Sequence, residues 1–329
     1  MAKQVVACLD VWAPNVRQVV RDNAPPELEL RFAGSHEEAE QLGLVRDCDL
    51  ILVGGAALTG SMVKAALPRL KFIQKWGIGV DRIDVEAVRR LGVPLAITGG
   101  ANAVPVAELA IALMLAVYRR IPYADRKTRA GEWIKPQMRG MCYMIDGKTV
   151  GLLGFGAIAK MVARRLAGFD CNVVYHDVNR ADHITERALN ARWVPFDELI
   201  TKSDILSIHV PLTKQTANII DAAQVARMKE GAILVNTARG GIVDEAALLA
   251  ALVSGKLRGA GIDTFAEEPP PKDHPLLQLE NVVLTPHAGG GVFDNVENVA
   301  RHAIGNMLKF LAGAPLPPQD IVVPVRTSG

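Results

Sequence analysis

Short apolar runs alternate with polar, amphipathic segments along the whole chain. Runs of four or five apolar residues are long enough for buried strands, and apolar residues three or four positions apart predict helices between them. This alternation predicts an α/β protein built on parallel sheets. The expected strands are residues 5–9, 28–32, 49–53, 72–75, 93–96, 150–153, 173–175, 205–209, 232–236, 259–263 and 282–284.

Helices are expected in the segments between these strands and in one long apolar segment. Their ranges are residues 36–44, 102–117, 158–169, 197–201, 221–228, 244–254 and 292–311. Residues 121–144 are expected to be irregular, because Gly131, Pro136 and Gly140 interrupt them. The pattern indicates two successive blocks of strands and helices, which suits two domains in a chain of 329 residues.

The most specific pattern lies in residues 149–177, where a strand, a glycine turn, a helix, a second strand and an acid follow one another. Gly154 permits a tight turn, Gly156 lets the backbone approach a pyrophosphate, and Ala159 is small enough for the helix to pack on the strand. The helix N-terminus offers N–H groups to phosphates. Glycine turns also occur in ordinary parallel sheets, but the strand, helix and acid together favour a dinucleotide site.

The acid that ends this pattern predicts which dinucleotide binds. Asp177 should accept hydrogen bonds from the adenosine ribose hydroxyls and repel a 2′-phosphate. NAD is therefore the expected cofactor. Arg180 follows closely and could bind a 2′-phosphate, which keeps NADP as the alternative.

Composition and charge exclude several classes of protein. The net charge of +2 gives no drive towards nucleic acid or an anionic membrane. The longest apolar stretch, residues 109–117, is too short to span a bilayer. The four cysteines are scattered without metal-site spacing, so no metal is expected. The first residues resemble a strand and not a signal peptide, so a cytoplasmic protein is expected.

Three further strands are followed by residues that suit redox chemistry on a hydroxy acid. Arg239, Glu268 and His287 each come after a predicted strand, and ligands of open parallel sheets bind beyond the carboxyl ends of strands. A guanidinium binds a carboxylate through two parallel hydrogen bonds, and an imidazole exchanges protons near neutral pH. A neighbouring carboxylate orients the imidazole and stabilises its charged form. Each residue alone could be an ordinary surface or loop residue, but together they predict hydride transfer at a carbon beside a carboxylate.

These stretches, together with residues 75–81, 147–151 and 209–213, resemble the D-isomer-specific 2-hydroxyacid dehydrogenases over nearly the whole chain. The resemblance implies an NAD-dependent oxidoreductase that interconverts a small 2-keto acid and its D-2-hydroxy acid. It implies His287 as the acid/base, Glu268 as its partner and Arg239 as the carboxylate anchor.

The same resemblance implies an architecture of two doubly wound parallel-sheet domains. A Rossmann NAD-binding domain, residues 102–287, would be inserted into a flavodoxin-like substrate-binding domain made of residues 1–101 and 288–329. The chain would form a homodimer through its NAD domains. The presence of Ala159 where the family more often has glycine is a mild departure.

The remaining site residues also come from the resemblance. Backbone amides of Gly77 and Ile78 would bind the substrate carboxylate together with Arg239, and Asp263 would contact the nicotinamide amide. The implied cofactor-binding residues are Gly154, Gly156, Ala157, Ile158, Asp177, His209, Thr237, Ala238, Asp263 and Gly290.

Two alternatives stay open at the level of the sequence. The first is a non-catalytic, NAD-sensing scaffold of the corepressor type, because such proteins resemble the same family and keep its triad. The second is a glyoxylate/hydroxypyruvate reductase that prefers NADP. The motifs do not specify which 2-hydroxy acid is the physiological substrate.

Overall fold

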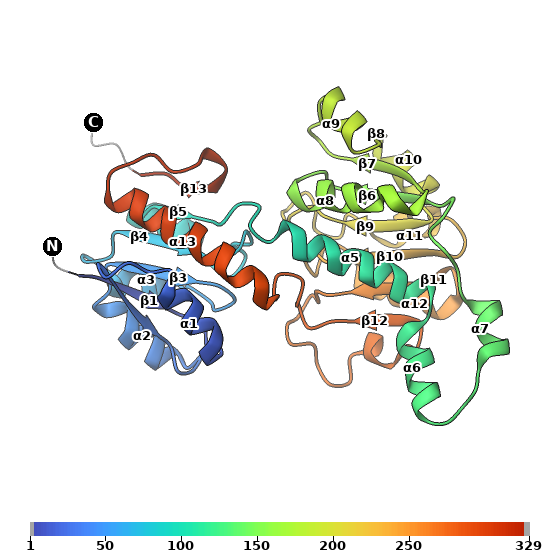
Figure 1. The fold of residues 1–329 in the computed structure, drawn as a ribbon, viewed down its shortest axis with the longest axis horizontal. Coiled ribbons are helices and arrows are strands. Elements are labelled where there is room, and N and C mark those ends of the chain that lie inside the picture. Colours follow the sequence, from blue (N-terminus) through green and yellow to red (C-terminus); the bar gives the residue numbers. More distant parts are fainter. Residues whose placement is uncertain (1–2, 326–329) are drawn as a thin grey trace. The chain divides into compact units, whose positions relative to one another are not determined.

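The computed structural model describes residues 3–325. The chain forms two compact units, each with one sheet (Figure 1). Unit 1 consists of Met1–Asn102 and Val292–Gly329, and unit 2 consists of Ala103–Gly291. The second unit is therefore an insertion in the chain of the first.

Within residues 3–325, unit 1 has six strands in the order β13-β5-β4-β3-β1-β2. Its elements are β1 (Gln4–Cys8), α1 (Pro14–Asp22), β2 (Leu28–Phe32), α2 (Glu38–Arg46), β3 (Leu50–Val53), α3 (Gly60–Ala66), β4 (Phe72–Lys75), α4 (Val85–Leu91), β5 (Leu95–Ala96), the 3₁₀ helix η3 (Phe293–Asn295), α13 (Val296–Leu311), η4 (Pro318–Asp320) and β13 (Ile321–Val323). Strands β1 to β5 are parallel in the flavodoxin-like order 2-1-3-4-5. The sequence pattern did not predict β13, which pairs antiparallel with β5.

Alternate residues of the strands in unit 1 pack on opposite faces of the sheet, as the two-residue period of a strand requires. Val6 and Cys8 of β1 belong to a core with α1 and α13. Val5 and Ala7 belong to a second core with α2, α3 and α4. Both faces of the sheet are therefore covered by helices, which explains why β3 is entirely apolar and β1 is apolar after its first residue.

Unit 2 has seven parallel strands in the order β12-β11-β10-β9-β6-β7-β8. Its elements are α5 (Ala103–Tyr118), α6 (Ile121–Arg129), α7 (Lys135–Met141), β6 (Thr149–Leu153), α8 (Ala157–Leu166), η1 (Ala167–Phe169), β7 (Asn172–His176), α9 (His183–Ala188), β8 (Ala191–Trp193), α10 (Phe196–Lys202), β9 (Ile205–Ile208), α11 (Ala222–Arg227), β10 (Ala232–Asn236), α12 (Glu245–Ser254), β11 (Leu257–Ile262), η2 (Pro275–Gln278) and β12 (Val282–Leu284). Counted from β6, this is the Rossmann order 3-2-1-4-5-6 with one more strand. The predicted fold class is confirmed, whereas the short strand β8 was not predicted.

Helices also cover both faces of the sheet in unit 2. Ile233 of β10 packs in a core with α5 and α8, and its neighbour Leu234 packs in a core with α10, α11 and α12. Helix α5 approaches β11 closely, because a Cβ placed on Gly261 would lie 2.8 Å from Cβ of Leu113. The glycine in this strand thus allows the long apolar helix to pack on the sheet.

The expectation that residues 121–144 are irregular was wrong. Helices α6 and α7 occupy most of this segment and lie outside the layers of sheet and helices in unit 2 (Figure 1). Neither helix buries a residue, so the sequence has no apolar period to reveal it. Each helix has its proline in the first two positions, where proline is well tolerated.

Two absences follow from the described part of the chain. Within residues 3–325, no helix is both long and apolar enough to cross a membrane. Within the same residues, no group of three or more histidine, cysteine, aspartate or glutamate side chains is arranged to hold a metal ion.

Candidate active site

The glycine turn after β6 has the geometry of a dinucleotide loop. Gly154 has a φ of +91°, and a Cβ on it would lie 2.9 Å from the carbonyl oxygen of His209. A Cβ on Gly156 would meet no atom within 4 Å, so space is open at the start of α8. Ala159 is fully buried. The open space beside the N-terminal N–H groups of a ten-residue helix fits the pyrophosphate of a dinucleotide.

Asp177 lies directly after β7 and is tied to the glycine turn. One carboxylate oxygen accepts a hydrogen bond from the backbone N–H of Phe155 at 2.7 Å, and the other accepts one from Asn179 at 2.9 Å. The acid at the end of the second strand is thus fixed beside the loop that would hold the phosphates. This position suits hydrogen bonds to ribose hydroxyls.

Arg180, the residue that would favour NADP, is held by an acid. Its Nε and Nη2 donate to the two carboxylate oxygens of Glu186, both at 2.9 Å. Hydrogen bonds from Arg180 and Tyr175 lower the pKa of Glu186 to about 2. The guanidinium therefore faces a permanent carboxylate at neutral pH, which reduces its capacity to bind a phosphate.

His209 follows β9 and packs against the glycine turn through its backbone. Its Nε2 lies 2.9 Å from the hydroxyl of Ser207. Burial lowers the pKa of His209 to about 4, so its imidazole is neutral at neutral pH. A neutral ring beside the phosphate loop offers hydrogen bonds without adding charge.

The loop after β10 carries Arg239 and is shaped by a buried asparagine that sequence reasoning left without a role. The side chain of Asn236 accepts a hydrogen bond from Ala238 N at 3.0 Å and donates one to Arg239 O at 2.8 Å. A Cβ on Gly240 would overlap the carbonyl oxygen of Phe265, so this loop lies directly against the loop after β11. An asparagine two residues before a loop donor is an Asx-turn signal that could have identified Asn236.

Glu268 and His287 form a hydrogen-bonded pair although they lie on different loops. Nδ1 of His287 lies 2.9 Å from Oε2 and 3.1 Å from Oε1 of Glu268. The side chains are 42% and 30% exposed, so both remain accessible from solvent. With Nδ1 directed at the carboxylate, Nε2 is the ring nitrogen that can exchange a proton with a ligand.

Asp263, at the end of β11, supports the backbone around His287. Its carboxylate accepts hydrogen bonds from the hydroxyl of Thr285 at 2.6 Å and from the backbone N–H groups of Ala288 and Gly289 at 2.8 and 3.0 Å. Its carbonyl accepts His287 N at 2.8 Å. His287 has a φ of +51°, which is uncommon for a residue with a side chain. Asp263 therefore stabilises the left-handed conformation that directs the imidazole towards Glu268.

The other predicted site residues lie on the same loops or in unit 1. Thr237 and Ala238 begin the loop after β10, and Gly290 follows His287. In unit 1, Gly77 N donates to the hydroxyl of Thr98 at 2.7 Å, and the neighbouring Ile78 side chain is 46% exposed. The ligand contacts assigned to all these residues, and the nicotinamide contact of Asp263, stay predictions.

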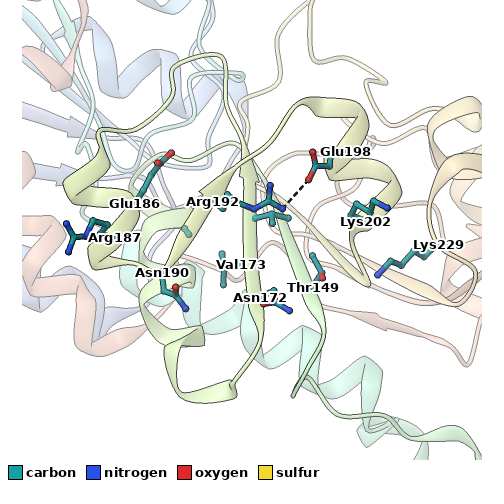
Figure 2. A pocket seen from close by; sticks show the side chains of 12 residues that line it. Thr149, Asn172, Val173, Glu186, Arg187, Asn190, Arg192, Glu198, Lys202 and Lys229 are labelled. Carbon is teal, nitrogen blue, oxygen red and sulfur yellow. Dashed lines mark hydrogen bonds and ion pairs between the residues drawn. The ribbon is translucent and has the colours of Figure 1, made fainter.

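A cavity of about 640 Å³ lies elsewhere in unit 2 (Figure 2). It is lined by the first residues of β6, β7 and β8, namely Thr149, Asn172 and Ala191, so it lies at the amino ends of these strands. Two of its lining residues, Arg192 and Glu198, point towards one another in Figure 2, and Nη2 of Arg192 donates a hydrogen bond to Glu198 at 3.1 Å. The predicted site residues do not line this cavity, and parallel sheets bind ligands at the opposite edge.

Comparison with known proteins shows which family has a similar sequence. The family model described as "D-isomer specific 2-hydroxyacid dehydrogenase, NAD binding domain" matches residues 111–289, more than half of the chain. The chain is also 37% identical over 327 residues to a glyoxylate reductase from Korarchaeum cryptofilum, covering 98% of this chain and 92% of that protein.

Two further comparisons involve a longer relative and a solved structure. The chain is 37% identical over 293 residues to D-3-phosphoglycerate dehydrogenase from Archaeoglobus fulgidus, which is 88% of this chain but only 54% of that protein. It thus spans about half the length of this relative. The crystal structure of NAD-dependent formate dehydrogenase from Staphylococcus aureus in complex with NAD superimposes with a TM-score of 0.85 and 29% identity, covering 98% of this chain and 99% of the other.

Proposed function

This chain belongs to the D-isomer-specific 2-hydroxyacid dehydrogenases, and we propose that it interconverts a small 2-keto acid and its D-2-hydroxy acid with Arg239, Glu268 and His287 as its catalytic residues. It is an NAD-dependent enzyme that acts on small 2-keto or 2-hydroxy acids. We further propose residues 102–287 as the NAD-binding domain, with residues 1–101 and 288–329 as the substrate-binding domain. The chain forms two compact units, and the inserted one contains the Rossmann sheet, which supports this division into domains.

The proposed reaction uses the protein to bind the acid and to move one proton. NAD supplies the hydride chemistry when it is bound. Arg239 binds the substrate carboxylate with its guanidinium fork. In reduction, Nε2 of His287 gives its proton to the carbonyl oxygen, and in oxidation it takes the proton from the hydroxyl. Glu268 holds Nδ1 of the ring, which fixes the orientation of Nε2 and stabilises the imidazolium.

The single observation that carries this proposal is the hydrogen bond between His287 and Glu268, in which Nδ1 lies 2.9 Å from Oε2. His287→Gln keeps a polar group in place but cannot supply a proton, so turnover should fall by about 10²–10⁴, the usual scale of general acid–base catalysis. Glu268→Gln should lower turnover less, because the amide oxygen can still accept a hydrogen bond from Nδ1 of the ring. The neighbouring Glu267→Gln is the matched control and should behave like the wild type.

Purified protein with NADH and a panel of 2-keto acids provides the measurement. Near-normal turnover in His287→Gln would remove the histidine from the mechanism. Absence of turnover by the wild type on every 2-keto acid, with NADH bound, would favour the scaffold alternative. The three proteins compared above are all named as enzymes, which supports catalysis over a scaffold role.

We also propose that the enzyme prefers NAD to NADP. The bonds of Asp177 to the glycine turn and the bidentate bond of Arg180 to Glu186 support this preference. A 2′-phosphate would meet the carboxylate of Asp177 and an arginine already held by an acid.

We propose a homodimer formed through the segment of α6 and α7. Neither helix buries a residue, and the apolar side chains of Ile121, Trp133 and Met144 are 50%, 78% and 66% exposed. Exposed apolar groups on a segment outside the core suit a self-complementary contact with a second copy of the chain. Light scattering should give a dimer, and Trp133→Glu should shift it towards the monomer; a monomeric wild type would contradict the proposal.

A further inference from the structure

The cavity at the amino edge of the sheet in unit 2 has the size of a small-molecule site. It is lined by the first residues of β6, β7 and β8, together with residues of α9, α10 and the turn before β10, so all of it lies within unit 2. Its volume of about 640 Å³ falls within the range of about 300–1,000 Å³ that is usual for ligand pockets. The charges of its lining therefore decide which ligand it accepts.

The acids that line the cavity are bound by arginines of the protein. Glu198 accepts a hydrogen bond from Nη2 of Arg192 at 3.1 Å. Glu186 accepts two hydrogen bonds from Arg180, both at 2.9 Å, and one from the hydroxyl of Tyr175 at 2.8 Å. A guanidinium at hydrogen-bond distance thus offsets the negative charge of each carboxylate.

Two further cations of the lining have no acid to offset them. Lys229 is paired with Asp204 at 3.0 Å. Arg187 in α9 and Lys202 at the end of α10 also line the cavity, and both are exposed. Within residues 3–325, neither of these two side chains has a hydrogen-bond or ion-pair partner. The lining therefore carries two unpaired positive charges.

The two unpaired cations lie on opposite sides of the cavity. Figure 2 shows Arg187 with Asn190 at one side and Lys202 at the other, with Arg192 between them. Asn172 and Asn190 also line the cavity and are exposed, and their side chains make no hydrogen bond within the described part of the chain. Their amides can therefore donate to an oxygen of a ligand. A ligand with two separated anionic groups can meet one cation with each group.

The cavity is separate from the dinucleotide loop, although the same strands border both. Strands β6 and β7 begin at the cavity, and the glycine turn and Asp177 follow their other ends. Each strand has five residues, which corresponds to about 16 Å at about 3.3 Å per residue. A ligand in the cavity therefore does not compete with a dinucleotide at the opposite edge.

We propose that this cavity is a second ligand site, which binds a small organic anion with two carboxylate or phosphate groups at the same time as NAD. The unpaired cations Arg187 and Lys202 provide one charge-assisted contact for each anionic group. The inference goes beyond the proposed function and does not depend on it, because no residue of the cavity takes part in the proposed reaction.

Calorimetric titration of the NADH-saturated protein at constant ionic strength tests the site. Citrate and fructose 1,6-bisphosphate are the probes with several anionic groups, and acetate and inorganic phosphate are their single-group counterparts. We expect citrate or fructose 1,6-bisphosphate to bind once per chain and at least about tenfold more tightly than its counterpart, because it gains a second charge-assisted hydrogen bond. The tighter of the two identifies the anionic group as carboxylate or phosphate. Saturable binding of neither, or affinities equal to those of acetate and phosphate, would overturn the inference.

Variants locate the binding in the cavity. Arg187→Gln and Lys202→Gln each remove one unpaired charge from an exposed side chain, so each should weaken binding of the tighter probe by about tenfold. Within the described residues, Arg164 and Lys309 are likewise exposed and unpaired but do not line the cavity. Arg164→Gln and Lys309→Gln are therefore controls with the same change of charge and should bind the probe like the wild type. Equal losses in variants and controls, or no loss in Arg187→Gln and Lys202→Gln, would show that the anion does not bind in this cavity.

Discussion

Backbone amides at the carboxyl edges of the two sheets differ in whether a side chain of the protein occupies them. In unit 1, Asp10 accepts hydrogen bonds from three amides that follow β3. In unit 2, space is open around Gly156 where α8 begins after β6. Both edges belong to doubly wound parallel sheets with glycines after a strand. The fold therefore provides amides for an anion at both edges, and one aspartate decides that unit 1 does not use them.

The largest effect is expected from filling the open space around Gly156 in unit 2. Gly156→Val would place a branched side chain in the space where the backbone must meet the pyrophosphate. Loss of two charge-assisted hydrogen bonds, each contributing about 1.5–3 kcal/mol, should weaken NADH binding by at least about 100-fold. Fluorescence titration of NADH measures this, with Gly168→Val as control, because a Cβ on Gly168 also meets no atom within 4 Å. Equal loss of affinity in both variants would contradict the assignment.

The converse experiment removes the carboxylate that occupies the amides after β3 in unit 1. Asp10→Ala would leave three amides of the loop after β3 without their acceptor, at a cost of about 1–3 kcal/mol in the free energy of unfolding. Inorganic phosphate should then bind the empty amides and raise the Tm of the variant, but not of the wild type. Thermal unfolding in phosphate and in chloride of equal ionic strength gives the comparison. Equal responses of the two proteins would mean that these amides do not form an anion site.

A smaller effect is expected at Asp177, which follows β7 in the sheet of unit 2. Asp177→Ala should weaken NADH and improve the relative use of NADPH by about tenfold, because a carboxylate repels the 2′-phosphate. Asp177 also bonds Phe155 N, so Asp177→Asn serves as control by keeping an acceptor oxygen without the charge. Kinetics with both cofactors would separate the two roles. A wild type that already prefers NADPH would refute the assignment.

The smallest effect should come from the acid that holds Arg180. The folded-state pKa of Glu186 is lowered to about 2 from 4.5, so its stabilising contribution is complete above pH 4.5 and is lost as the pH falls through 2. Glu186→Gln should therefore be less stable than the wild type at pH 6, and the difference should shrink towards pH 2. Urea unfolding across this range measures it. Glu198→Gln, which loses the 3.1 Å bond to the exposed Arg192, is the control. A constant difference at every pH would rule out the charge of Glu186 as its source.

Local patterns were sufficient for the strands and for the dinucleotide loop. Predicted strands such as residues 28–32 and 232–236 coincide with β2 and β10, because apolar runs and glycine turns are encoded over a few neighbouring residues. Helices α6 and α7 were missed because they bury nothing, and β8 and β13 because three residues carry too little pattern. A signal that depends on burial disappears where an element is exposed or very short.

The sequence by itself determined eleven of the strands, the glycine turn with Asp177, and the residues that follow the strands of unit 2. Only the tertiary structure decided which of these side chains meet. The hydrogen bond of Glu268 to His287, the support of the His287 backbone by Asp263 and the occupation of three amides by Asp10 each join loops that are far apart in the sequence. Their geometry depends on sheet register and on helix packing across the domain, whereas the sequence pattern records only the spacing of neighbours along the chain.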